Sequence, residues 1–405
     1  MTTSRPVAWS FWILCSLFYA YQYILRVMPS LMVGDLMQQF HIDATLFGQY
    51  SGVYYIGYAL MHIPLGLLLD RYGPRKVMTI CILLCVVGNL PIVFADHWMY
   101  PILGRVLLGI GSSAAILSTF KIIRMVFQEK LFTRMLSLSV TIGLLGAIYG
   151  GGPVSFLCGK WGYQTVVEVF AALGIILALA SYLILPDIKF QQKEGIMKGI
   201  KAVFTNTRVL AVCFFAGCMV GPLEGFADVW GAVFLKQAYG LNPDVANYLP
   251  SLIFLGMCFG APVLSLIAEK TENYLACIIT AGSLMLMFFI ALICHWLNVA
   301  SISVGFVIVG ICCAYQILAI YKASTYVSDH VAGLMTAVAN MIIMSFGYAF
   351  HSIIGYAVNL YGGPAVGQAL VNGLSILPAG LAVGVLGFAF LSLTEKSFQG
   401  HAKSL

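Results

Sequence analysis

Long apolar stretches follow one another along almost the whole chain, and polar or Gly/Pro-rich segments separate them. Each stretch reaches the ~20 residues that a helix needs to cross the hydrocarbon core of a bilayer. We therefore expect an all-α membrane protein with twelve transmembrane helices. The expected spans are 7–36, 44–69, 75–95, 98–123, 134–158, 164–186, 209–235, 246–268, 273–295, 298–324, 332–359 and 367–393.

One connection is longer and more polar than the others, and it lies at the middle of the chain. It predicts two pseudo-symmetric six-helix bundles, an N-terminal one at 1–186 and a C-terminal one at 209–405, joined by a cytoplasmic linker at 187–208. The fourth and tenth spans are alike over Gly109–Lys121 and Gly310–Lys322, which share five identical residues at an offset of 201. Parallel repeats of this kind are one way to build an alternating-access transporter, with the substrate site between the halves.

The composition agrees with a chain that lies mostly in the membrane. Hydrophobic residues make up 61% of the 405 residues and charged residues only 9%, whereas a soluble domain is about half apolar and about a quarter charged. This excludes a soluble enzyme, a nucleic-acid-binding protein and a disordered chain. With the N-terminus in the cytoplasm, seventeen of the 21 Lys and Arg residues fall on the cytoplasmic side. That is the positive-inside pattern, and twelve spans then place both termini in the cytoplasm.

The loop between the second and third spans carries the sharpest motif, GLLLDRYGPRK at residues 66–76. Gly66 permits close helix approach, Gly73 and the following proline impose a turn, and the basic residues hold the loop in the cytoplasm. Asp70 can pair with cations or with the N-terminus of a neighbouring helix. An ordinary positive-inside loop is the alternative. In the second half, Glu269 stands at the place that corresponds to Asp70.

This loop resembles the GxxxDRxGRR signature of the major facilitator superfamily, although Pro74 replaces the first basic residue after the glycine. Arg105 in span four begins an element similar to RxxxGxG of the same superfamily, where it is linked to proton coupling. A structural arginine paired with backbone carbonyls or a carboxylate is the alternative. Residues 146–153 are similar to a glycine-proline element of antiporters, without its trailing glycine pair. The resemblance implies the fold of that superfamily and a conformational gate that stabilises the outward-open state, formed by Gly66, Asp70, Arg71, Gly73 and Arg75.

Polar side chains inside the spans are candidates for the substrate site. Arg26 in span one shares a helix face with two tyrosines and a glutamine, and span two presents tyrosines at steps of four residues. The resemblance places spans one and seven along the cavity, where a guanidinium fork suits a carboxylate or phosphate. Alternatively, Arg26 extends to the outer interface and the tyrosines belong to the aromatic belt. The candidates for substrate binding are Arg26, Tyr19, Gln22, Tyr23, Tyr54 and Tyr58.

Glu224 and Asp228 lie four residues apart in span seven, hence on one helix face. Mutual repulsion and desolvation both favour the protonated form of such carboxylates, which suits a group that must load and release a proton. Arg105 and Glu168 are further candidates for proton coupling. Alternatively, Asp228 faces outer water and Glu224 pairs structurally with Arg26 or Arg105.

Residues 26–30 and 226–231 are similar to a proteobacterial subgroup that includes intraphagosomal amino-acid transporters, and siderophore carriers occur among related sequences. We therefore expect a secondary active transporter of the major facilitator superfamily. It would take up a small polar metabolite, an amino acid or other carboxylate, by proton-coupled alternating access. An exporter or antiporter of drugs or siderophores is the first alternative. A non-transporting membrane sensor or enzyme is the second.

Other expectations concern cofactors, partners and location. The sequence contains no GxxxxGK[ST], GxSxG or HExxH motif, so we expect no enzymatic activity. The proton gradient would supply the driving force, with no cofactor and no metal. The expected partners are a small-molecule substrate and the lipid bilayer, without nucleic acid. We expect a monomeric, multi-pass protein of the bacterial inner membrane.

Overall fold

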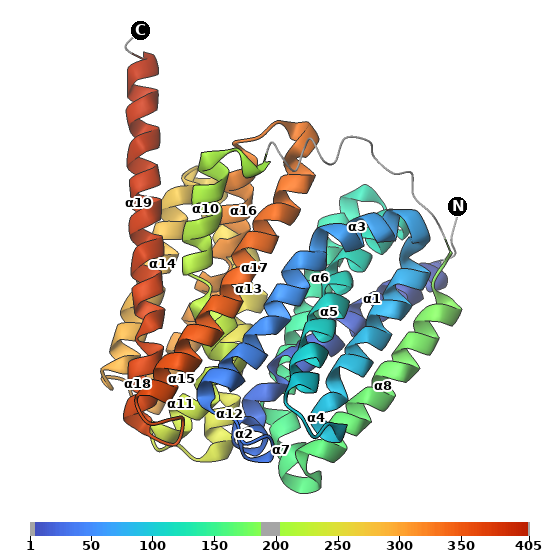
Figure 1. Cartoon of the computed structure of the whole chain (residues 1–405). Coiled ribbons are helices and arrows are strands. Elements are labelled where there is room, and N and C mark those ends of the chain that lie inside the picture. The colour runs from blue at the N-terminus through green and yellow to red at the C-terminus, as the bar shows by residue number, and fades with distance from the viewer. Residues whose placement is uncertain (1–4, 188–202, 404–405) are drawn as a thin grey trace.

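The computed structural model of the chain describes residues 5–187 and 203–403, and the secondary structure assigned within them is helical (Figure 1). In these residues, eleven helical stretches are long and apolar enough to cross a membrane. The longest, Ala44–Phe94, contains a residue outside helical geometry, Gly73, with φ 79° and ψ 165°. A left-handed φ of this kind favours glycine. Gly73 therefore divides the stretch into two spans, and the predicted total of twelve is confirmed.

The first six spans form the N-terminal half. The expected first span, 7–36, is not one helix, because Pro29 has no backbone N–H to continue an α-helix. The chain there consists of α1 (Arg5–Val27), the 3-10 helix η1 (Met28–Leu31) and α2 (Val33–Gln39). The other helices are α3 (Ala44–Asn89), α4 (Pro91–Phe94), α5 (Met99–Val126), η2 (Glu129–Leu131), α6 (Phe132–Gly150), α7 (Gly152–Trp161) and α8 (Tyr163–Ile184).

The other six spans form the C-terminal half, and most of the predicted linker between the halves lies outside the described residues. Span seven is broken near its middle, where Gly221 and Pro222 begin a segment with π-helical hydrogen bonding. This half contains α10 (Thr207–Cys218), the π-helix η3 (Gly221–Trp230), α11 (Gly231–Gln237), α12 (Pro243–Tyr248), α13 (Ser251–Thr271), α14 (Tyr274–Ile293), α15 (Val299–Cys313), α16 (Tyr315–Ser324), α17 (Asp329–Leu360), α18 (Gly367–Leu374) and α19 (Ile376–Lys403).

The two halves use glycines in the same way to pack equivalent helices. Gly57 and Gly109 bring α3 and α5 so close that a side chain at either position would meet a backbone carbonyl of the other helix. Gly256 and Gly310 do the same between α13 and α15. Spans eight and ten thus pack as spans two and four do. This agrees with the internal repeat, in which Gly109 and Gly310 are matched positions.

The halves contact each other at the end of the molecule opposite the two termini, where α2, α7 and α12 lie in Figure 1. We call this the closed end. Gly48 near the start of α3 lies directly against the backbone of α17. Asn359 donates a hydrogen bond to Asp43 over 2.9 Å, and Asn247 of α12 donates one to Ser155 of α7 over 2.6 Å. Both bonds join one half to the other.

Candidate functional site

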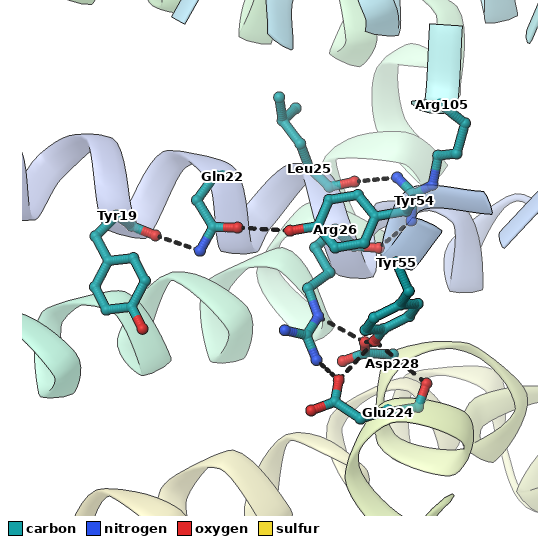
Figure 2. A network of polar contacts seen from close by, with 9 residues as sticks. All are labelled: Tyr19, Gln22, Leu25, Arg26, Tyr54, Tyr55, Arg105, Glu224 and Asp228. Atoms are coloured by element: carbon teal, nitrogen blue, oxygen red, sulfur yellow. Dashed lines mark hydrogen bonds and ion pairs between the residues drawn. The ribbon is translucent and has the colours of Figure 1, made fainter. Parts of the chain in front are cut away.

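A buried ionic cluster joins the two halves at the end of α1. Arg26 lies in the last turn of this helix, and its Nε donates a hydrogen bond to Asp228 Oδ2 over 2.7 Å (Figure 2). Its guanidinium also forms an ion pair with Glu224. Arg26 is 5% exposed and both carboxylates are 1% exposed. An N-terminal cation and two C-terminal anions are thus packed together out of contact with solvent.

The π-helix η3 presents both carboxylates to Arg26. A π-helix has a wider turn than an α-helix and occurs frequently at functional sites. Its i→i+5 bonding still leaves residues four apart close to one face, so Glu224 and Asp228 point the same way. Asp228 does not face outer water, which was one of the alternatives. Glu224 does pair with Arg26, as the same alternative had it.

Tyr55 of α3 joins this cluster, although its sequence position did not single it out. Its hydroxyl lies 2.6 Å from Glu224 Oε2 and is also hydrogen-bonded to Asp228 Oδ2. Arg26 Cζ lies 5.1 Å from the ring centroids of both Tyr23 and Tyr55, at cation–π distance. A guanidinium, two carboxylates and two phenol rings therefore form one compact unit.

A sequence signal for Tyr55 exists in retrospect. Gly48, Gly52 and Tyr55 follow one another at steps of four and three residues, so they share one face of α3. Both glycines lie directly against α17, and the ring of Tyr55 lies against Gly347 of the same helix. A stripe of small residues that ends in a tyrosine thus marked the face of α3 toward the other half.

Arg105 of α5 binds backbone rather than a carboxylate. Its Nη1 donates to the carbonyl of Leu25 over 2.9 Å and its Nη2 to the carbonyl of Arg26 over 2.7 Å. These carbonyls belong to the last turn of α1, where no further turn of helix satisfies them. The Arg105 guanidinium also lies 5.0 Å from the centroid of the Tyr54 ring. Arg105 therefore caps α1 and fixes the backbone from which Arg26 extends.

The remaining predicted substrate residues form a second chain of contacts beside this cluster. The Tyr54 hydroxyl donates to Gln22 Oε1 over 2.9 Å, and Gln22 Nε2 donates to the carbonyl of Tyr19 over 3.2 Å. The ring of Tyr58 is stacked on that of Tyr54, with 6.1 Å between centroids. Spans one and two thus bring the predicted residues together. Glu168 is different, because its side chain is exposed on α8 and lies outside these contacts.

Buried polar atoms of the cluster region without a hydrogen-bond partner among the described residues include Glu224 Oε1, Asp228 Oδ1, Arg105 Nε and Nδ1 of His351, whose ring is stacked on Tyr55. Buried polar atoms are nearly always paired, so each such atom requires an explanation. Each carboxylate uses one oxygen on Arg26 and Tyr55 and keeps the other free as an acceptor.

The predicted gate residues make contacts within the N-terminal half. Asp70 forms an ion pair with Lys121 of α5. Arg75 lies over the ring of Tyr182 in α8, 4.8 Å from its centroid, and also donates to the carbonyl of that residue. Gly66 has no heavy atom within 4 Å of the place where a side chain would begin. The expectation that Gly66 brings two helices together is therefore not met in this conformation.

The equivalent contact in the second half uses a different acid. Lys322 corresponds to Lys121 in the repeat, and it pairs over 3.0 Å with Glu395 of α19. Glu269, at the position that corresponds to Asp70, is exposed. Within the described residues, the lysine of each half therefore pairs with a carboxylate. The two carboxylates lie on helices that do not occupy equivalent positions in the repeat.

A pocket of about 250 Å³ lies between the halves at the closed end. Both halves line it, with Ser30 and Gly34 from the first and Lys236, Asn247 and Pro364 from the second. Arg26 and the two carboxylates are not among its lining residues. Arg26, Glu224 and Asp228 are buried in this conformation, so the ionic cluster is closed to solvent.

Two six-span halves with buried charges between them are the architecture of a membrane transporter. The sequence matches the family model of the Major Facilitator Superfamily over residues 11–352. The chain belongs to this superfamily. It is 21% identical over 372 residues to the uncharacterized transporter YybO of Bacillus subtilis, which covers 84% of this chain and 81% of YybO. It is 22% identical over 234 residues to the nitrite extrusion protein of the same organism, with 56% of each chain covered.

Solved structures of transporters share the fold. A bacterial homologue of the human lysosomal transporter Spinster, in an inward-facing and occupied conformation, aligns with a TM-score of 0.78 at 17% identity, over 98% of this chain and 99% of that one. A mutant of the nucleoside transporter NupG aligns with a TM-score of 0.78 at 14% identity, over 94% and 99% of the two chains. The predicted fold and superfamily are confirmed.

Proposed function

We propose that this protein is a proton-coupled importer of a small polar metabolite that carries a carboxylate. The observation that supports this function best is the buried ion pair of Arg26 with Glu224 and Asp228, because it links the two halves at the closed end. Alternating access requires that end to open and the pair to separate. A carboxylate of the substrate could then replace the two acids on the Arg26 guanidinium.

The contacts of Tyr55 favour one bound proton in this cluster. A phenol has a single hydrogen to donate, so Tyr55 can donate to only one of the two carboxylates that it contacts. The other carboxyl group can form a hydrogen bond with Tyr55 only when it is itself protonated and donates to the phenol oxygen. The two acids then carry one negative charge, which Arg26 balances. This supports transport of one proton per cycle.

The proposed orientation places the closed end outside the cell and both termini in the cytoplasm of a bacterium, because the positive-inside pattern favours it. The structure would then represent a state closed toward the outside. In each cycle the carboxylates on η3 would take their one proton from outside while this end is open and Arg26 binds the substrate. The gate contacts of Asp70 and Arg75 would rearrange as the cytoplasmic end closes, and the protein would act as a monomer.

The proposal can be tested with Glu224→Gln in proteoliposomes. A coupling ratio of one proton would allow about tenfold accumulation for each unit of pH difference, since one pH unit corresponds to ~1.4 kcal/mol. We expect the variant to lose accumulation under a pH gradient and to keep substrate exchange. Radiolabelled uptake and counterflow measure the two activities, after thermal-shift screening of amino acids, peptides, organic acids and iron chelators has found the substrate.

Glu168→Gln is the matched control, because it removes an exposed carboxylate of α8 that does not contact the cluster. It should accumulate substrate as the natural chain does. Concentration of substrate against a gradient by Glu224→Gln would refute the coupling role of Glu224. The same vesicles decide between import and export: substrate added outside should carry protons inward, whereas an exporter would exchange the two in opposite directions.

A further inference from the structure

The ionic cluster is divided between parts that must move against each other. Arg26, Tyr23 and Tyr55 belong to the N-terminal half, and Glu224 and Asp228 belong to the C-terminal half. Opening of the closed end therefore leaves a cation on one wall of the opening and two carboxyl groups on the facing wall. Water solvates both walls while the end is open. When the site closes over a ligand, each wall needs a replacement for its lost partner, because a buried charge without a partner is strongly unfavourable.

The buried Arg, Lys, Asp and Glu side chains of the described residues are Arg26, Arg105, Glu224 and Asp228. His351 of α17 is also buried, its ring is stacked on that of Tyr55, and it belongs to the half that carries the two acids. Arg105 is already committed to the carbonyls of Leu25 and Arg26, and it moves with the N-terminal half. A ligand or a proton must therefore supply the missing charges.

The free oxygens show what the C-terminal wall can accept. Glu224 Oε1 and Asp228 Oδ1 have no hydrogen-bond partner among the described residues although both side chains are buried, and Figure 2 shows each carboxylate contacting Arg26 and Tyr55 through its other oxygen. Two unpaired carboxylate oxygens on one helix face accept N–H donors and are best satisfied by a cationic one.

From this arrangement we infer that the substrate is a zwitterion, with its carboxylate on Arg26 and its ammonium group between Glu224 and Asp228. This inference rests on the proposed function and narrows its substrate class. A ligand of this polarity replaces both partners of the separated ion pair at once. With one proton on the two acids, the ammonium group balances the remaining negative charge.

Ligands with a single charge fit less well. A simple carboxylate satisfies Arg26 but leaves the negative charge on η3 without a cation. A simple amine satisfies η3 but leaves Arg26 without an anion. The difference between these ligands is one charge-assisted contact in a buried site, which corresponds to at least about tenfold in affinity.

Matched trios of ligands test the inference on the purified full-length chain. The first trio is L-alanine, L-lactate and ethylamine, and the others derive in the same way from L-leucine and L-phenylalanine. We expect one or more of the amino acids to raise the melting temperature and to accumulate in proteoliposomes with an acidic exterior. The hydroxy acid and the amine of the same trio should need at least about tenfold higher concentrations.

Asp228→Asn examines the ammonium contact directly. It should weaken binding of the amino acid and leave binding of the hydroxy acid unchanged, so the difference within a trio should disappear. Glu129→Gln, which changes an exposed carboxylate of η2 with no part in the cluster, is the control and should keep that difference. Because the readout is a ratio between two ligands of the same variant, a general loss of stability does not imitate it.

Each other result rejects a defined part of the argument. Equal binding of hydroxy acid and amino acid would refute the zwitterion and leave the proton-coupled transport of carboxylates standing. Binding of the amine as tight as that of the amino acid would refute both the zwitterion and the role of Arg26. If no amino acid binds or accumulates while another carboxylate found by the screen does, the zwitterion falls and the proposed function stands.

Discussion

Arg26 depends on a second arginine for its position. Arg105 binds the carbonyls of Leu25 and Arg26 and so fixes the last turn of α1. Because the backbone of Arg26 is held in this way, its side chain can reach across to η3 and bind both carboxylates. The planar guanidinium matters for this geometry, since it can serve two acceptors in one plane and stack on phenol rings.

Arg26→Lys should therefore weaken substrate binding by about tenfold or more, or ~1.4 kcal/mol at least. Lysine keeps the charge but lacks the planar fork for a carboxylate and the face that lies over Tyr23 and Tyr55. Isothermal titration calorimetry with the identified substrate measures the loss. Arg124→Lys is the control, because Arg124 lies over Phe132 away from the cluster. Unchanged affinity in Arg26→Lys would place the carboxylate site elsewhere.

For single residues, the sequence indicated which charged side chains belong to the site but not which of them contact each other. Arg26, Glu224 and Asp228 could be recognised because a charge inside a span is rare and costly. The contact of Arg26 with Glu224 was only one alternative, since the sequence of one span does not tell which way it faces the other half. Tyr55 was missed for the same reason. Tyr54 and Tyr55 are adjacent tyrosines on different faces of α3, and the sequence does not tell which of the two faces the other half.

Among the elements, α3 and α17 form the most extensive contact between the two halves in the described part of the chain. A side chain at Gly48 would meet the backbone of His351 and Gly355. Gly48→Ala should therefore push the helices apart and disfavour the closed state by about 1–3 kcal/mol, which is typical of overpacking. Gly159→Ala is the control, because nothing lies within 4 Å of that position.

Spin labels on Gln38 and Gln368 can measure this effect, because both side chains are exposed near the closed end on opposite halves. Exposed Cys294 would first be replaced by serine. Double electron–electron resonance should show longer distances in Gly48→Ala than in Gly159→Ala. Identical distance distributions would mean that this helix contact does not control the closed end.

The membrane-spanning helices could be predicted from the sequence, but the 3-10 and π-helical segments within them could not. The twelve spans follow from apolar length, and the break at Gly73 follows from a Gly-Pro turn within a basic loop. Span seven is broken where Gly221 and Pro222 begin the π-helix, and the sequence analysis did not predict a π-helix there. The 3-10 helix after α1 shortened the first span for a local reason, the missing N–H of Pro29.

At the scale of the whole molecule, orientation in the membrane is the expectation that labelling can check most directly. Cys294 is exposed in the connection between α14 and α15, which lies outside the cell in the proposed orientation. A membrane-impermeant maleimide added to intact cells should label the natural chain, and Cys294→Ser should lose most of this labelling. Labelling of Cys294 only after the cells are broken would reverse the orientation.

The pairing of two like halves could be predicted, because the repeat around Gly109 and Gly310 is visible in the sequence. Which end of the molecule is closed could not, since the same sequence must support both states of a transporter. The difference between them is carried by contacts such as that of Asn359 with Asp43, which are too weak and too distant in sequence to infer.

The division of the ionic cluster between the halves also has an electrical consequence. When Arg26 parts from Glu224 and Asp228, charge is displaced within the membrane, and the transmembrane voltage acts on that displacement. A full crossing by one elementary charge corresponds to ~2.3 kcal/mol per 100 mV, and a partial one to a fraction of this. Transport should therefore respond to voltage even when both sides have the same pH, and the potential of the living cell would help to set which side the protein faces at rest.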